Sequence, residues 1–127
     1  MNTTEPLTIT VQQSTPGRVV LALSGPCDFE TVEDLRQAAD EALAATPSPH
    51  CLTLDFTDVD DWDSSGLSSL IYAKRLTDTD GVRLHVTGLD THQQEILHLT
   101  GLDLYLADAL THSCQDHTAD PTAVTAT

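Results

Sequence analysis

Two adjacent hydroxyls, Ser64 and Ser65, stand directly behind a cluster of carboxylates and at the start of a helical pattern. The clustered acids are Asp58, Asp60, Asp61 and Asp63. Such residues suit four kinds of chemistry: a serine nucleophile, a calcium loop, an aspartate-based phosphatase, or a hydroxyl that accepts a phosphate.

The sequence disfavours the first two. A serine nucleophile on a strand-to-helix turn needs a Gly two residues before it, and Trp62 and Asp63 occupy those positions. A calcium loop starting at Asp58 would carry Trp62 at its fifth position, Asp63 in place of the turn Gly and Ser69 in place of the bidentate Glu.

An aspartate-based phosphatase is suggested only by Asp58-x-Asp60 after an apolar run. Such an enzyme needs distant acids that complete a magnesium site and a catalytic Lys, whereas the only Lys is Lys74 in the next helical segment. The histidines are also scattered without ligand spacing. We therefore expect no enzymatic activity, no metal and no cofactor.

A phosphate acceptor fits the physics of this position best. The first turn of a helix offers unpaired N–H groups and the positive end of the helix dipole, so a phosphate can sit there without melting the helix. The phosphate would add a charge of about -1.5 to -2 beside four aspartates and would repel a surface fitted to the unmodified loop. A plain N-cap role for Ser64 or Ser65 is compatible with this role.

Composition restricts the partners. The formal net charge of -15 arises from 20 acidic and 5 basic side chains, which argues against binding nucleic acid or an anionic membrane through a basic surface. The sequence contains no apolar run long enough to span a membrane. Three cysteines, an odd number without C-x-x-C spacing, predict no disulfide framework and a reducing, cytoplasmic setting.

The elements around the serines follow an α/β pattern. Apolar periodicity and turn signals predict strands, helices and the breaks between them. The expected strands are 7–11, 18–24, 51–56, 82–86 and 102–106, and the expected helices are 31–46, 65–77, 90–101 and 107–112. Thr31 with Asp34 and Asp90 with Gln93 have capping-box spacing, and Gly101 suits a helix C-terminus.

This order predicts one domain over residues 1–112 and a disordered tail over 113–127, which has almost nothing to bury. The fold class is α/β, with a small mixed sheet of four to five strands flanked by helices and an antiparallel hairpin that precedes β-α units. Loops at the carboxyl ends of parallel strands share one edge, so the acidic segment should lie beside Gly88-Leu-Asp90.

The run Asp63-Ser64-Ser65-Gly66-Leu67, after an apolar strand and an aromatic residue, resembles the signature of the STAS domain, as in the anti-anti-sigma factors of bacteria. Gly25-Pro-Cys-Asp28 and Thr100-Gly101-Leu102 resemble further family features, so the resemblance covers about residues 1 to 110. Ser68 stands where the family commonly has a second Gly, and Trp62 is larger than usual.

The resemblance implies that Ser64 is phosphorylated and that the unmodified protein binds an anti-sigma factor, which is also its serine kinase, and frees a sigma factor. A phosphatase then resets the switch. The alternative is a non-phosphorylated STAS accessory or scaffold subunit of a transporter or sensor assembly. The expected partner-binding residues are Asp28, Asp61, Trp62, Asp63, Ser65, Gly66 and Ser68.

Several of these residues have two open interpretations. Asp63 either orients the Ser64 hydroxyl or the kinase's cation and phosphates, or it caps its own loop. Gly66 either lets a partner approach closely or relieves crowding at the helix start. Asp28 either joins the contact edge or serves as a turn or cap residue.

Overall fold

The computed structural model describes residues 7–28 and 31–111, and the predicted tail 113–127 lies outside them. Four strands form one mixed sheet in the order β1-β2-β3-β4. The elements along the chain are β1 (Thr8–Thr15), β2 (Arg18–Cys27), α1 (Val32–Ala45), β3 (Cys51–Trp62), α2 (Ser64–Asp80), β4 (Arg83–Thr87), α3 (Thr91–Thr100), α4 (Leu102–Tyr105) and α5 (Ala107–Thr111). The predicted α/β class, with an antiparallel β1-β2 hairpin followed by parallel β2-β3-β4 pairing, is confirmed.

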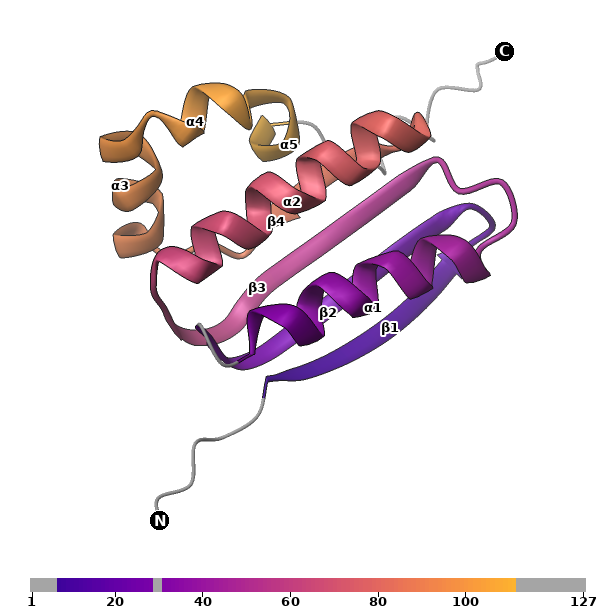
Figure 1. The fold of residues 1–127 in the computed structure, drawn as a ribbon, viewed down its shortest axis with the longest axis horizontal. Coiled ribbons are helices and arrows are strands. Elements are labelled where there is room, and N and C mark those ends of the chain that lie inside the picture. Colours follow the sequence, from indigo (N-terminus) through magenta and orange to yellow (C-terminus); the bar gives the residue numbers. More distant parts are fainter. Residues whose placement is uncertain (1–6, 29–30, 112–127) are drawn as a thin grey trace.

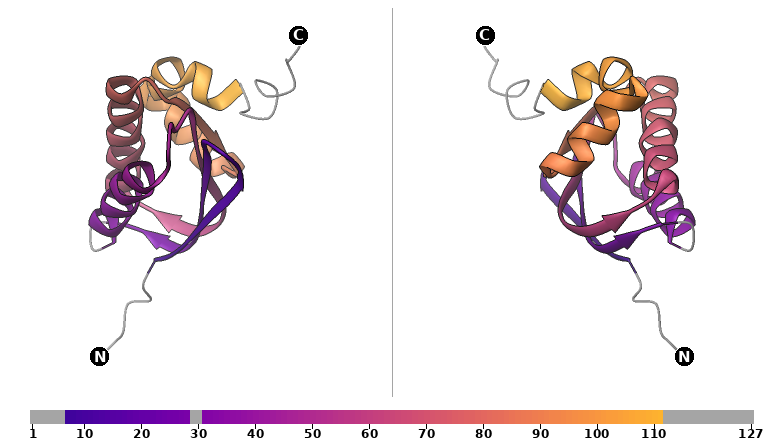
Figure 2. Two further views of the ribbon diagram at one scale, coloured as in Figure 1. Left: turned by 90° about the vertical axis from the view of Figure 1, so that its right-hand side faces the viewer. Right: turned by 90° about the vertical axis from the view of Figure 1, so that its left-hand side faces the viewer.

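Rows of apolar side chains across the parallel strands form the core. Val19 pairs with Leu52, which pairs with Leu84, and the next buried row is Leu21, Leu54 and Val86. Helices α1 and α2 lie side by side over the sheet, whereas α3, α4 and α5 gather beyond α2 and β4, away from β1 (Figures 1 and 2). The core therefore lies between the sheet and the amphipathic faces of the helices.

Strand β3 is longer than the sequence predicts, because it continues through the acidic segment to Trp62. Its pairing with β2 shifts twice, and each shift leaves one extra residue in β3: Ala22 and Ser24 face Asp55 and Asp58, whereas Gly25 and Pro26 face Val59 and Asp61. These shifts are bulge-like irregularities, and Pro26 at the second one needs no regular ladder hydrogen bond.

The bulges explain why the acids are exposed. Beyond Phe56 the buried positions recur every third residue, at Val59 and Trp62, instead of every second. Asp58 and Asp60 consequently remain in solvent. The expectation of a loop after Phe56 is wrong, since the bulged strand itself presents the carboxylates.

Three smaller expectations are also wrong. Leu102–Tyr105 is the short helix α4 and not a strand, whereas the predicted final helix is present as α5. Cys51 is disulfide-bonded, contrary to the expectation from the cysteine count, whereas Cys27 is a free buried thiol. The predicted capping box at Thr31 does not form, because Thr31 makes no side-chain cap hydrogen bond.

Candidate functional site

The site is centred on the first turn of α2. Ser64 is the first residue of this 17-residue helix and is exposed, and Asp63 is exposed immediately before it. The Gly66 amide donates to the Asp63 carbonyl at 2.9 Å and closes the turn. Within the described part of the chain, the Ser64 hydroxyl makes no hydrogen bond, so it is open to a reagent from solvent.

Trp62 anchors this turn to the core. Trp62 is 8% exposed, and its indole meets the ring of Phe56 edge-on, with ring centroids 5.7 Å apart and an interplanar angle of 61°. Gly66 packs directly on the indole, since a Cβ there would lie 2.5 Å from Trp62 Cε3. Both predicted contact residues are thus buried, and Gly66 relieves crowding at the helix start. Direct contact of either with a partner stays a prediction.

The carboxyl end of β2 lies beside this turn, because Cys27 pairs with Trp62. Asp28, which follows Cys27, is half-buried. The Thr31 hydroxyl holds this bend by donating to the Pro26 carbonyl at 2.9 Å and accepting from the Asp28 amide at 3.0 Å. Asp28 is therefore positioned by a turn in which the Thr31 hydroxyl takes part. The spacing of Thr31 and Asp34 had predicted a capping box there instead.

The pKa of the Cys27 thiol depends on the charges at the same corner. Burial raises the pKa of its thiol to about 11, a contact with the Ser69 hydroxyl opposes that shift, and the carboxylates of Asp28 and Asp63 add to it. Asp28 and Asp63 therefore both act on one buried group, although they belong to different strand ends. The corner is negative before any modification.

Ser68 lies one helical turn along α2, where its hydroxyl donates to the Ser64 carbonyl at 3.3 Å. It faces a groove of about 220 Å³ between α1 and α2, which is lined by Arg36, Ser68, Ile71, Tyr72 and Arg75. The Tyr72 hydroxyl donates to Asp40 at 2.8 Å, and this bond raises the pKa of the phenol. Ser68 therefore lies one helical turn from Ser64 and belongs to the groove between α1 and α2.

The carboxyl end of β4 packs against the middle of β3. Gly88 lies against Thr57 and Asp55, which precede the four clustered acids, and contact between these acids and Gly88-Leu-Asp90 stays a prediction. The Asp55 carboxylate accepts hydrogen bonds from the Thr57 amide at 3.0 Å and the Thr57 hydroxyl at 2.6 Å. Sequence reasoning missed this pair, although an Asp side chain that accepts from the backbone amide two residues on is a recognisable local signal.

The structure therefore brings Asp28, Trp62, Asp63, Ser64 and Gly66 to one corner, with Ser68 a turn further along α2. The side chains of Asp61 and Ser65 lie outside the described residues, and their predicted contacts stay predictions. Over residues 7–28 and 31–111, no cluster of three His, Cys, Asp or Glu side chains could hold a metal ion. None of the described helices is long and apolar enough to cross a membrane.

Sequence comparison identifies the family. Residues 10–110 match the family described as "Mlab, STAS domain", and the chain therefore belongs to the STAS domain family. A search among curated proteins finds no match.

Solved structures share the fold. An anti-sigma factor antagonist from Mycobacterium paratuberculosis is 28% identical, with a TM-score of 0.70 and 93% of each chain covered. The anti-sigma factor antagonist SpoIIAA in its unphosphorylated form is 15% identical, with a TM-score of 0.64 and coverage of 92% of this chain and 99% of SpoIIAA. A sulfate transporter family protein from Wolinella succinogenes is 20% identical, with a TM-score of 0.63 and 75% of each chain covered.

Proposed function

We propose that this protein is a cytoplasmic, non-enzymatic anti-sigma factor antagonist whose binding is switched by phosphorylation of Ser64. In its unphosphorylated form it binds an anti-sigma factor that is also a serine kinase, and a sigma factor is thereby released. Phosphate on Ser64 ends this binding, and a phosphatase restores it. The interaction is with proteins, without nucleic acid or membrane.

The observation that carries this proposal is the position of Ser64. Its hydroxyl is exposed on the first residue of a long helix and is not engaged by any described side chain. A kinase can therefore reach the oxygen without unfolding the chain. The amides at the N-terminus of the helix and the positive end of its dipole favour the phosphate that results.

The charge of the corner explains how the modification would end binding. A phosphate adds about -1.5 to -2 charges, next to Asp63 and close to Asp28, with Asp58 and Asp60 exposed on the bulged strand before it. A partner surface that fits the unmodified corner would meet a new, strongly hydrated anion. Because Ser64 itself is exposed, the core does not need to change.

The comparisons support the same class of function. The Mycobacterium paratuberculosis antagonist resembles this chain along nearly its whole length. SpoIIAA is known in both an unphosphorylated and a phosphorylated form, and both resemble this chain with a TM-score of 0.64. These are properties of those proteins. The proposal that Ser64 is phosphorylated in this chain rests on the position of Ser64.

Intact mass spectrometry tests the proposal. The chain is incubated with ATP and the serine kinase encoded nearest to it in its own genome, and the expected product carries one phosphate. Ser64→Ala should gain none, whereas Ser68→Ala, which removes an exposed hydroxyl from the same helix, should gain one as wild type does. Phosphate on Ser65, or on no residue, would refute the assignment.

A second candidate is an accessory or scaffold subunit of a transporter or sensor assembly, which needs no phosphorylation. It is favoured by the shared fold with the Wolinella succinogenes protein and with the murine anion transporter Slc26a9, for which the TM-score is 0.70. This candidate predicts that incubation with ATP and the kinase adds no phosphate to the protein. It also predicts equal binding of its partner assembly by wild type and by Ser64→Glu.

A further inference from the structure

The groove between α1 and α2 carries positive charge in a protein that is acidic overall. The sequence has a formal net charge of -15 and only 5 Lys and Arg side chains, and two of these, Arg36 and Arg75, line the groove. The other lining residues, Ser68, Ile71 and Tyr72, are uncharged, and the volume of the groove is about 220 Å³. The walls of this α1–α2 groove therefore offer two guanidinium groups and no carboxylate.

The α1–α2 groove lies on the same face of α2 as Ser64. Ser68, Ile71, Tyr72 and Arg75 follow Ser64 by 4, 7, 8 and 11 residues, a spacing that keeps all five on one side of a helix. Arg75 is about 16 Å from Ser64 along the helix axis, at about 1.5 Å per residue. An interface that buries about 800 Å² of each partner is roughly 30 Å across, so a partner that covers Ser64 also reaches the groove.

The two arginines are differently engaged. Arg75 is exposed and makes no ion pair or hydrogen bond with any described residue. Arg36 lies over the ring of Tyr72, with 5.1 Å between its Cζ and the ring centroid, and its Nη1 is 3.4 Å from the exposed carboxylate of Glu33. An exposed ion pair of this kind contributes little, and Asp40, the acid that accepts from the Tyr72 hydroxyl, does not pair with either arginine. Stacking thus positions Arg36, and Arg75 is available to a new carboxylate.

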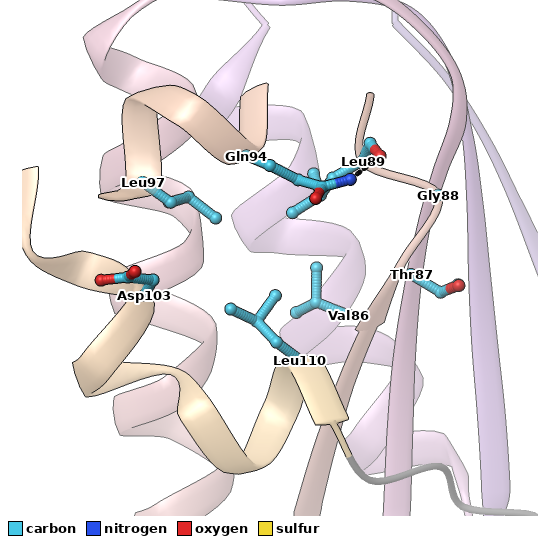
Figure 3. A pocket seen from close by; sticks show the side chains of 8 residues that line it. All are labelled: Val86, Thr87, Gly88, Leu89, Gln94, Leu97, Asp103 and Leu110. Atoms are coloured by element: carbon cyan, nitrogen blue, oxygen red, sulfur yellow. Dashed lines mark hydrogen bonds between the residues drawn. The ribbon is translucent and has the colours of Figure 1, made fainter. Parts of the chain in front are cut away.

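Other hollows in the described part of the chain differ in charge. The cavity of about 360 Å³ beside β4 and α3 is lined by apolar side chains and a few polar ones, and its one charged lining residue is an acid, Asp103 (Figure 3). The hollow at the start of β4 has Asp78 and Asp108 beside Lys74 and Arg83. Of these three hollows, the α1–α2 groove is the one that suits an anion.

We propose that the α1–α2 groove binds an acidic side chain of the same protein partner that contacts the Ser64 corner. A carboxylate there would pair with Arg75 and Arg36, because planar guanidinium groups match its geometry. An apolar neighbour of that acid would cover Ile71 and the ring of Tyr72, which are partly exposed. The inference rests on the proposed function and adds a second contact to it.

The two contacts have opposite charge along one face of α2. The corner around Ser64 is negative because of Asp28 and Asp63, whereas the groove is positive. Contacts of both signs fix the direction in which a partner lies across the helix. A second copy of this chain also has acids to offer, but a net charge of -15 on each copy opposes self-association.

Isothermal titration calorimetry of the full chain against the purified serine kinase of the proposed function tests the contact. Arg36→Gln/Arg75→Gln removes both charges of the groove and should bind at least about tenfold more weakly than wild type. The matched control is Lys74→Gln/Arg83→Gln, which removes the same charge from residues outside the groove. The control should bind within about threefold of wild type.

Single changes at Arg75 separate recognition from stability. Because Arg75 is exposed and bonds to no described residue, Arg75→Gln should leave thermal unfolding unchanged while it weakens binding. Arg75→Lys keeps the charge and should bind more tightly than Arg75→Gln. The difference between wild type and Arg36→Gln/Arg75→Gln should shrink when salt rises from about 0.1 M to about 1 M, because the Debye length falls from about 10 Å to about 3 Å.

Four other results would overturn the proposal. An equal loss of affinity in both double variants would mean that net charge alone decides. Wild-type affinity of Arg36→Gln/Arg75→Gln would remove the groove from the interface, and weak binding by Ser64→Glu in the same series would leave the proposed function standing. Dimerisation of wild type that Arg36→Gln/Arg75→Gln abolishes would assign the groove to a second copy. If wild type did not bind the kinase at all, the proposed function and this inference would fail together.

Discussion

A Cβ on Gly66 would lie 2.5 Å from Cε3 of Trp62 and 2.9 Å from its Cβ. The helix that presents Ser64 can therefore approach the strand end only because residue 66 has no side chain. The glycine of the Asp-Ser-Ser-Gly-Leu run is explained by packing against one aromatic residue of the core, and the geometry of Ser64 depends on that contact.

Gly66→Ala should destabilise the protein by about 1 to 2 kcal/mol. A methyl group forced against a buried indole costs about 1 to 3 kcal/mol, and the better helix propensity of Ala returns at most about 1 kcal/mol. Urea unfolding followed by circular dichroism measures the loss. Ser68→Ala, at an exposed position of the same helix, should change stability by less than about 0.5 kcal/mol. Equal stability of Gly66→Ala and wild type would contradict the packing role of Gly66.

Two other glycines allow the cost of backbone strain to be separated from the cost of a steric clash. Gly81 and Gly88 both have positive φ, 69° and 83°, but a Cβ on Gly81 would meet nothing within 4 Å, whereas one on Gly88 would collide with Thr57 and Asp55. Gly81→Ala should cost only the strain, about 1 to 2 kcal/mol. Gly88→Ala should cost at least about 1 kcal/mol more, because the neighbouring part of β3 must move.

The same unfolding experiment compares the two variants. A larger loss in Gly88→Ala shows that the end of β4 is fitted closely against the middle of β3, the strand that leads to Ser64. A loss no larger than that of Gly81→Ala would mean that this contact between β4 and β3 relaxes easily.

The buried thiol of Cys27 makes stability depend on pH above neutrality. Burial raises its pKa from 9.0 to about 11, so the folded state keeps a proton that the unfolded state releases. The stabilisation is complete below pH 9 and is lost as pH rises to about 11, by up to about 3 kcal/mol, since one pKa unit corresponds to about 1.4 kcal/mol.

The control is Cys27→Ala, which has no thiol to titrate. Its free energy of unfolding should fall less steeply between pH 9 and 11 than that of wild type, whatever its absolute stability. The raised pKa of Tyr72 is common to both proteins and cancels in the difference. Parallel curves would show that the thiol is not held protonated by the fold.

The sequence predicts most of the architecture, because its signals are local. Asp90 and Gln93 form both hydrogen bonds of the predicted capping box, and Gly101 ends the same helix in the left-handed conformation. Such signals are satisfied within one turn, so no knowledge of distant residues is needed.

The predictions fail where a contact between residues that are distant in sequence determines the local structure. The Thr31 hydroxyl has the right spacing to cap its helix, but it bonds to the Pro26 carbonyl because the end of β2 is brought against it. Apolar and polar residues alternate over Leu102–Leu106, as in a strand, but five residues cannot separate the two periods, and the segment forms α4.

The sequence predicts that Ser64 lies where a strand is followed by a helix, but it does not predict how the corner around Ser64 is built. The bulges that extend β3 to Trp62 appear only as a change of burial interval from two to three, which a period-based search interprets as the end of the strand. The proximity of Asp28 to Asp63 likewise depends on strand pairing that no short motif encodes.

The proposed switch makes a prediction that separates charge from shape at residue 64. Ser64→Glu should bind the anti-sigma factor kinase at least about tenfold more weakly than wild type, because a carboxylate joins Asp63 at the exposed corner. Ser64→Gln has nearly the same shape without the charge and should keep most of the affinity. Isothermal titration calorimetry against the purified kinase measures all three proteins.

Thermal unfolding is the companion measurement. Both variants should unfold near the wild-type temperature, since residue 64 is exposed and the helix N-terminus tolerates an anion. Weak binding by Glu and strong binding by Gln would then be a property of the surface charge and not of a damaged fold. If Glu and Gln weakened binding equally, shape at residue 64 would decide recognition, and the repulsion mechanism would fail even if Ser64 is phosphorylated.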